Sequence, residues 1–318
     1  MILLSNFLQI DLPALIVAVL ASVSCTLLGN FLVLRRQSMI GDAISHVVLP
    51  GLVAGFLIAG SLAVLPMMAG ALAAALVSVG LIELIRRVGN LEPGAAMGVV
   101  FTIMFAAGIV LLEQSGGRNI HLDAHHALYG QLEATLWLGP ETWSAFLTPE
   151  VWRAIPHQIP VLASVTVLIG IGILLFYKEL KLVTFDPVLA DSLGIPARAV
   201  GAGLVAAVAV AAVAAFEAVG SVLVIAMIIC PAATARMLTD RLSRQIGVSL
   251  IVAVLSGAGG YAMAAFMPLW LGGENSLNAA GMIAVLAGFL QTLAMLFAPR
   301  YGIVPRLRAR RAEVTAAA

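Results

Sequence analysis

The chain has 318 residues, of which 62% are hydrophobic and only 10% are charged, and its mean hydropathy is +1.08. An ordinary soluble domain has about 45–50% apolar and about 25% charged residues, so this composition excludes a water-soluble globular protein and predicts a polytopic helical membrane protein. The net charge of +1 gives no indication of nucleic-acid binding.

Nine apolar stretches come close to the ~20 residues that a helix needs to cross a bilayer. They predict an all-α transmembrane bundle of about eight or nine spans that forms a single domain over residues 1–318. The sixth and seventh stretches are separated by almost no loop, so either of them could be a broken or re-entrant segment. The predicted spans are Leu12–Leu34, Met39–Ile58, Leu62–Ile85, Pro93–Leu112, Ile159–Phe176, Ala197–Phe216, Val219–Ala235, Ile246–Leu271 and Ala279–Ala298.

Lysines and arginines predict the orientation of the chain, because positive charge accumulates on the cytoplasmic side of membrane proteins. All but two of the 17 basic residues fall in connections on one side of the predicted bundle, and the exceptions are Arg118 and Arg153. We therefore expect the N-terminus outside and the C-terminus, with a basic tail over residues 299–318, in the cytoplasm. The first apolar stretch lacks a basic leader and a small-residue cleavage site, so we expect it to remain as a span.

The second span contains two ionisable residues, Asp42 and His46, which are four residues apart and share one face of a helix. An ionisable side chain inside a membrane is costly and normally faces a partner or a water-filled path. The pair could therefore line a path for a metal ion, or it could form a structural ion pair with a neighbouring span. Facing pairs from two copies would supply two carboxylates and two imidazoles, a mixed site that suits first-row transition metals.

The external segment, residues 113–158, is the least hydrophobic part of the chain. His121, Asp123 and His125 there could capture metal, or the segment could form a docking surface for another protein. Its three tryptophans, including Trp137, suit the membrane interface. Glu217, at the junction of the sixth and seventh spans, could be a further carboxylate of the path or an interfacial residue.

The coupling segment, residues 178–198, is the longest internal piece without an apolar run. Asp186 can cap a short helix that begins at Pro187 and ends before Gly194. Such a helix has no core of its own to enter, so its apolar residues predict docking to another protein.

Several motifs make the chain resemble the membrane permease subunit of ATP-binding-cassette importers for manganese, zinc and ferrous iron. The motifs extend from the second span to the C-terminus and occupy residues 41–51, 122–123 with 128–130, 185–187 with 192–195, 219–227 with 231–235, and 298–302.

The resemblance implies a permease dimer, of identical or paralogous copies, in the bacterial inner membrane. The dimer would rest on two cytoplasmic ATP-binding subunits and receive metal from an external binding protein, with no permanently bound cofactor. It implies that Asp42 and His46 meet the metal, and that the ATPase contacts residues Phe185, Asp186, Pro187, Leu189, Leu193 and Gly194. The chain itself has no phosphate-binding loop of the Gly-x-x-x-x-Gly-Lys-Ser/Thr type, so we expect ATP hydrolysis on a partner and not on this chain.

Two alternative functions remain open for this chain. The main alternative is a proton-coupled secondary metal transporter, in which Asp42, His46 and Glu217 relay protons. An intramembrane metalloenzyme lacks a His-Glu-x-x-His motif and a third ligand. The residues around His46 resemble manganese and iron members more than zinc members, whereas nitrogen and oxygen ligands in general favour zinc.

Overall fold

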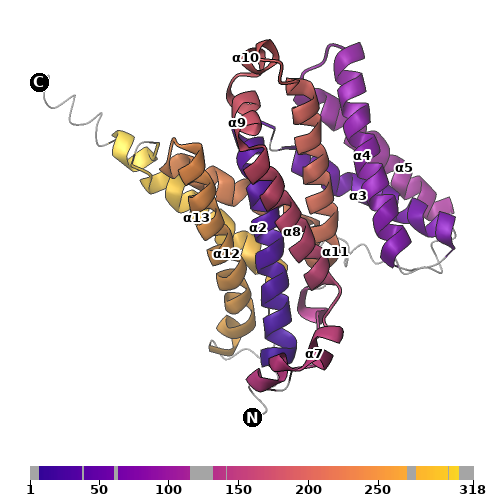
Figure 1. Cartoon of the computed structure of the whole chain (residues 1–318), viewed down its shortest axis with the longest axis vertical. Coiled ribbons are helices and arrows are strands. Elements are labelled where there is room, and N and C mark those ends of the chain that lie inside the picture. Colours follow the sequence, from indigo (N-terminus) through magenta and orange to yellow (C-terminus); the bar gives the residue numbers. More distant parts are fainter. Residues whose placement is uncertain are drawn as a thin grey trace, which may run out of the picture.

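The computed structural model describes residues 7–37, 39–60, 64–114, 132–140, 142–270, 277–299 and 301–307. Within these residues all regular secondary structure is helical, which confirms the predicted all-α class. Figure 1 shows three groups of helices: α3, α4 and α5 on one side, α2, α8 and α11 in the middle, and α12 and α13 on the other side.

Eight helices in the described part of the chain are long and apolar enough to cross a membrane, within the predicted eight or nine. The spanning helices are α2 (Leu12–Leu34, preceded by the π-helical turn η1, Phe7–Asp11), α3 (Met39–Ala59), α4 (Val64–Val88), α5 (Pro93–Gln114), α8 (Gln158–Leu175), α11 (Ala197–Leu238), α12 (Leu242–Trp270) and α13 (Ala279–Phe297). The shorter elements are η2 (Leu132–Ala134), η3 (Trp143–Leu147), α7 (Pro149–Arg153), α9 (Tyr177–Phe185) and α10 (Pro187–Ser192).

The predicted sixth and seventh spans lie in one helical run, the 42-residue α11. A straight helix of this length would measure about 63 Å, roughly twice the ~30 Å thickness of a bilayer core. The run is broken at the buried Gly220, whose backbone angles are φ 75° and ψ 168°. This conformation is essentially restricted to glycine. The chain therefore changes direction at Gly220 alone. Two separate spans, as predicted, would have needed a loop between them.

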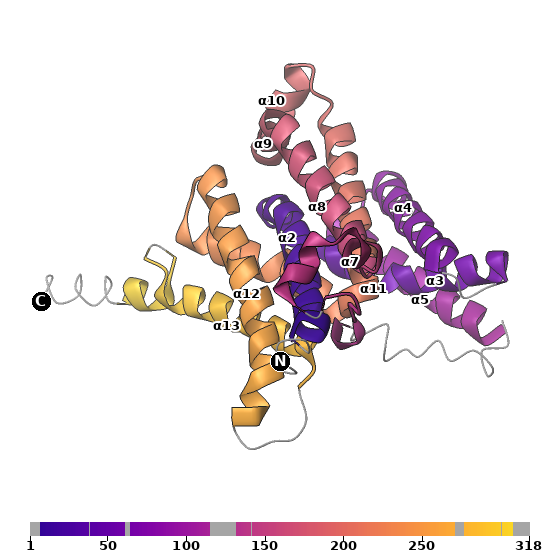
Figure 2. The same ribbon diagram turned by 60° about the horizontal axis from the view of Figure 1, so that its bottom comes forward.

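The central helix α2 packs against α8, α11 and α12, and the rotated view in Figure 2 shows the same central position. Gly29 makes close packing possible, because a Cβ atom at this position would collide with the backbone carbonyl of Ile228 in α11. Small residues allow such close approach where lipid provides no hydrophobic driving force between helices.

Helix α3 packs tightly on α4, and α5 covers another side of it. A Cβ atom at Gly51 of α3 would lie 2.6 Å from the carbonyl oxygen of Gly70 in α4. The backbones of these two helices are thus in direct contact.

Buried polar side chains join the central helices. The amide of Asn30 in α2 donates to the hydroxyl of Ser249 at 2.7 Å and accepts from Gln245 of α12 at 3.2 Å. Thr26 of α2 donates to the carbonyl oxygen of Met227 in α11 at 2.9 Å. All of these side chains are buried, so the polar groups satisfy one another away from solvent.

Candidate metal path and coupling segment

His46 lies in α3 between two phenylalanine rings of α5. Its imidazole stacks on Phe101, with ring centroids 5.4 Å apart and an interplanar angle of 28°. Phe105, one turn further along α5, meets it edge-on at 5.6 Å and 76°. The side chain is partly buried, and the two rings hold the plane of the imidazole. The sequence analysis did not identify these phenylalanines, although their spacing of four residues in a predicted span was a possible signal.

Asp42 precedes His46 by one turn of α3, as the sequence predicts. The side chain of Asp42 lies outside the part of the structure that is described. Among the described residues, no cluster of three or more His, Cys, Asp or Glu side chains could hold a metal ion. Within the described residues, His46 is thus an imidazole in a packed aromatic setting, next to the position of Asp42 one turn earlier.

Glu217 pairs with His157, the last residue before α8. The Oε1 atom of Glu217 lies 2.6 Å from Nε2 of His157, and the two side chains are 26% and 53% exposed. Glu217 is in α11, three residues before the break at Gly220. The pair links the external segment to the broken helix, which gives Glu217 a defined structural partner.

The external segment contains the other predicted metal-capturing residues, His121, Asp123 and His125, which lie outside the described residues. The described part of the segment packs onto the bundle: Trp137 donates its backbone N–H to the carbonyl of Gln9, and a carboxylate oxygen of Glu133 accepts from the N–H of Ala279.

Trp137 is buried within the protein and does not present its indole at the surface. Its side chain is 2% exposed, donates its indole N–H to the carbonyl of Val151 at 2.9 Å, and packs edge-on against Phe146 and Trp152. Phe146 and Trp152 supply apolar contact and the carbonyl of Val151 supplies the hydrogen-bond acceptor, so both parts of the buried indole are satisfied.

The coupling segment folds as its residues predict. Asp186 caps α10 by accepting a hydrogen bond from the N–H of Leu189 at 2.9 Å, and Pro187 is the first residue of the helix. Gly194 follows the helix with φ +80°, a conformation that favours glycine. Asp191 accepts a hydrogen bond from the N–H of Ala197, which is the first residue of α11.

The outer face of the coupling segment is apolar and exposed. Val188, Leu189 and Leu193 are 78%, 45% and 64% exposed, and Phe185 is 55% exposed. Isolated exposed apolar residues are common, but four within nine residues at the tip of a helical hairpin form a contiguous surface suited to a partner.

The sequence pattern of the ABC 3 transport family matches residues 7–136 and 144–298. The chain belongs to the ABC 3 transport family.

Among its relatives is the manganese transport system membrane protein MntD of Bacillus subtilis, which is 38% identical over 288 residues, covering 91% of this chain and 92% of the relative. The zinc transport system membrane protein TroD of Treponema pallidum is 37% identical over 301 residues, covering 95% of this chain and 77% of the relative. Among solved structures, PsaBC from Streptococcus pneumoniae in complex with Fab superposes with a TM-score of 0.67 at 27% identity, covering 91% of both chains.

The chain is accordingly the permease subunit of an ATP-binding-cassette transporter, a multi-pass membrane component of a family in which a separate subunit hydrolyses ATP. The predicted family membership and the prediction that the chain is not an enzyme are confirmed.

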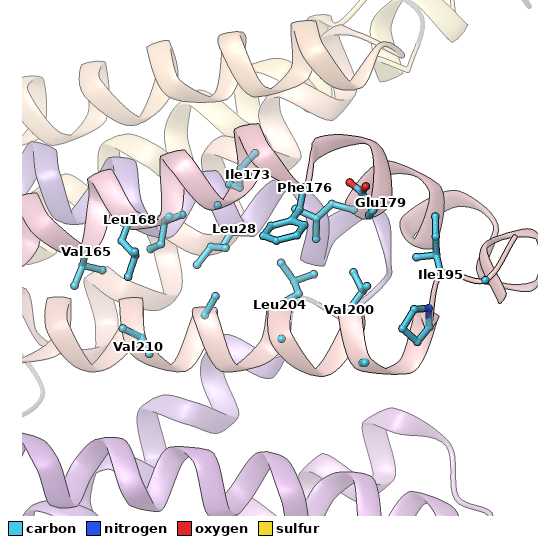
Figure 3. Close-up of a pocket in the computed structure, with 18 residues that line it drawn as sticks. Leu28, Val165, Leu168, Ile173, Phe176, Glu179, Ile195, Val200, Leu204 and Val210 are labelled. Carbon is cyan, nitrogen blue, oxygen red and sulfur yellow. The ribbon is translucent and has the colours of Figure 1, made fainter.

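The ABC 3 permease has an apolar cavity of about 660 Å³ between α8, α9 and α11 (Figure 3). Leu168 and Ile173 line one wall and Leu204 and Val210 the other, and Glu179 is the single ionisable residue of the lining. A divalent ion requires several oxygen or nitrogen ligands, so this cavity does not suit the passage of metal.

Helices α4 and α5 of the permease expose many large apolar side chains in the single chain. Leu65 and Leu84 of α4 are 81% and 55% exposed, and Ile103 and Val110 of α5 are 61% and 52% exposed. In a membrane these residues contact either lipid or another transmembrane chain.

Proposed function

We propose that this permease carries a divalent transition metal ion inward across the bacterial inner membrane, with manganese as the first candidate and zinc and ferrous iron as alternatives. The observation that carries the proposal is the position of His46, one turn after Asp42 and held between Phe101 and Phe105. The names of the manganese and zinc relatives support a metal of this class.

The proposed path needs a second copy of the permease or a paralogue of it. Asp42 and His46 of one chain supply one carboxylate and one imidazole, too few to hold an ion stripped of most of its water. Two chains that meet near α5 would bring together two carboxylates and two imidazoles, a set suited to borderline metals. The exposed apolar faces of α4 and α5 are consistent with such a contact.

The path must also release its ion, so its ligands should bind metal only moderately. Carboxylate and imidazole without thiolate meet this requirement, because thiolate ligands would retain soft metals strongly.

The coupling segment is proposed to dock on a cytoplasmic ATP-binding subunit. Its capped helix α10 and the exposed Phe185, Val188, Leu189 and Leu193 form the surface for this contact. In the assembly that we propose, the whole chain acts as one permease domain, the N-terminus is external, the C-terminal tail is cytoplasmic, and an external binding protein delivers the metal to the external segment.

The proposal is tested by metal uptake into vesicles that contain the permease, its candidate ATP-binding subunit and its delivery protein. Manganese, zinc and ferrous iron are offered in turn to the wild type, His46→Phe and His46→Ala. The phenylalanine variant preserves an aromatic ring against Phe101 and Phe105 but cannot bind metal. We expect ATP-dependent uptake of one ion by the wild type and a loss of at least about tenfold in both variants.

The matched control is His157→Phe, the same substitution at the histidine that pairs with Glu217. It should retain uptake. Loss in His157→Phe with retention in His46→Phe would move the path from α3 to the region of Glu217. Uptake that ignores ATP and follows a proton gradient would instead support the secondary transporter.

A further inference from the structure

A second cavity, of about 350 Å³, lies between the ends of α2, α4 and α10 and the beginnings of α3, α5 and α11. We refer to it as the arginine cavity because four arginines contribute to its lining: Arg35, Arg86, Arg87 and Arg198. It shares no lining residue with the proposed metal path, and its positive charge would repel a metal cation.

The two carboxylates of the arginine cavity are already engaged. Glu83 binds Nη1 of Arg86 at 3.3 Å and Nε of Arg87 at 2.8 Å. Asp191 accepts a hydrogen bond from the backbone N–H of Ala197 at 2.9 Å. With four arginines and two carboxylates in its lining, the cavity keeps an excess of positive charge.

Arg35 is the most constrained of the four arginines. A Cβ atom on Gly201 of α11 would lie 2.7 Å from its Nη2 atom, so the guanidinium rests directly on the glycine backbone. Its Nη1 atom is buried and has no hydrogen-bond partner among the described residues, and the same holds for the Oε1 atom of the neighbouring Gln37. Burial and the nearby Arg86 lower the pKa of Arg35, so an anionic partner would stabilise its charged form.

The remaining wall of the arginine cavity is apolar. Its side chains are Ile40, Val79, Ile82, Met97 and Val205. A free phosphate ion would satisfy the guanidinium groups but would leave this wall in contact with water. An amphiphile with an anionic head and an apolar body satisfies both parts, and basic pockets between the cytoplasmic ends of membrane helices are typical sites for anionic lipid headgroups.

We propose that the arginine cavity binds an anionic phospholipid. The headgroup phosphate would lie between Arg35 and Arg198. The first carbons of the acyl chains, next to the glycerol, would lie along the apolar wall. A hydroxyl on the headgroup, as in phosphatidylglycerol, would also donate to Gln37. The bound lipid joins the ends of α2 and α4 to the first turns of α11, immediately after the coupling segment. This site goes beyond the proposed function, because it requires neither metal nor ATPase.

The test measures lipid binding to the purified full-length permease in detergent by native mass spectrometry. The probes are dioleoyl phosphatidylglycerol and dioleoyl phosphatidylcholine, with inorganic phosphate as a competitor. Phosphatidylglycerol should bind with at least about fivefold higher affinity than phosphatidylcholine, because each arginine near an anionic headgroup contributes about that factor. Phosphate should displace little of it.

Three variants locate the site. Arg198→Gln removes an exposed charge and should weaken phosphatidylglycerol binding about fivefold. Gly201→Ala keeps every charge but displaces the Arg35 guanidinium, and it should weaken binding by a similar factor while the helix remains intact, since alanine is the better helix former. The control Arg244→Gln removes an exposed arginine of α12 outside this cavity and should bind lipid as the wild type does.

Four results would overturn the proposal. The first is equal binding of the two lipids by the wild type, and the second is unchanged binding in both Arg198→Gln and Gly201→Ala. The third is a loss in Arg244→Gln as large as in the cavity variants, which would indicate general surface charge. The fourth is efficient displacement of lipid by inorganic phosphate, which would make the cavity a phosphate site. None of these results bears on metal uptake, so the two proposals fail separately.

Discussion

At the scale of single residues, two positions have roles that their neighbours define. His46 is held by two phenylalanine rings, and Gly220 adopts backbone angles that other residues avoid. Both residues are in predominantly apolar helices, and the surroundings of each give its helix a specific local geometry.

Gly220→Ala should destabilise the permease. The angles of φ 75° and ψ 168° lie in a region that costs about 1–3 kcal/mol for a residue with a Cβ atom. The measurement is thermal unfolding of the purified variant, with Gly203→Ala in the regular part of α11 as the control, because a Cβ atom at Gly203 meets no other group. Equal stability of the two variants would show that the break at Gly220 carries no strain.

Glu217→Gln should have a small effect. The ion pair with His157 is partly exposed, and such pairs contribute less than about 1 kcal/mol after solvent screening. We expect nearly unchanged metal uptake and a slightly lower unfolding temperature. A large loss of uptake with normal stability would place Glu217 in the path.

At the scale of elements, α2 is joined to α11 and α12 by buried hydrogen bonds and close backbone contacts, whereas the coupling segment projects from the bundle (Figure 1). The first arrangement stabilises the fold, and the second provides a surface for a partner.

Asn30→Ala should lower the free energy of unfolding by about 1–2 kcal/mol. The substitution removes bonds to Ser249 and Gln245 and leaves their buried polar groups unsatisfied. Ser22→Ala is the control, because the Ser22 hydroxyl donates to the carbonyl of Ala18 in its own helix and to no other helix within the described residues. If both variants unfold at the same denaturant concentration, the network does not hold α2 and α12 together.

Leu193→Asp should abolish copurification of the ATP-binding subunit without destabilising the isolated permease, because Leu193 is 64% exposed on the coupling segment. Leu147→Asp, at an 88% exposed leucine of the external segment, is the matched control and should retain the subunit. Retention of the ATP-binding subunit by Leu193→Asp would argue against α10 as its docking element.

At the scale of the whole molecule, the proposed metal site draws its ligands from two chains, so transport should depend on both copies of the proposed dimer. In a tandem fusion of two permeases with His46→Ala in one copy, uptake should fall well below half of the wild-type fusion. A single shared path loses one of its four ligands, whereas two independent paths would lose one half of their flux. Uptake close to half would therefore contradict a shared path.

Local properties of the sequence determined the membrane class, most of the spans, the positions of Asp42 and His46 one turn apart in one helix, and the capping of α10. Apolar length, i to i+4 spacing and the Asp-Pro start of a helix are properties of one continuous segment, so the chain reveals them directly.

Only the tertiary structure decided which spans meet. His157 pairs with Glu217, 60 residues away, and Gln245 with Asn30, 215 residues away. Phe101 and Phe105 close around His46, and Arg35 comes to rest on Gly201. Apolar helices have similar compositions on all faces, so their sequences do not specify their neighbours. The fit of small residues between backbones and the few buried polar groups select the arrangement.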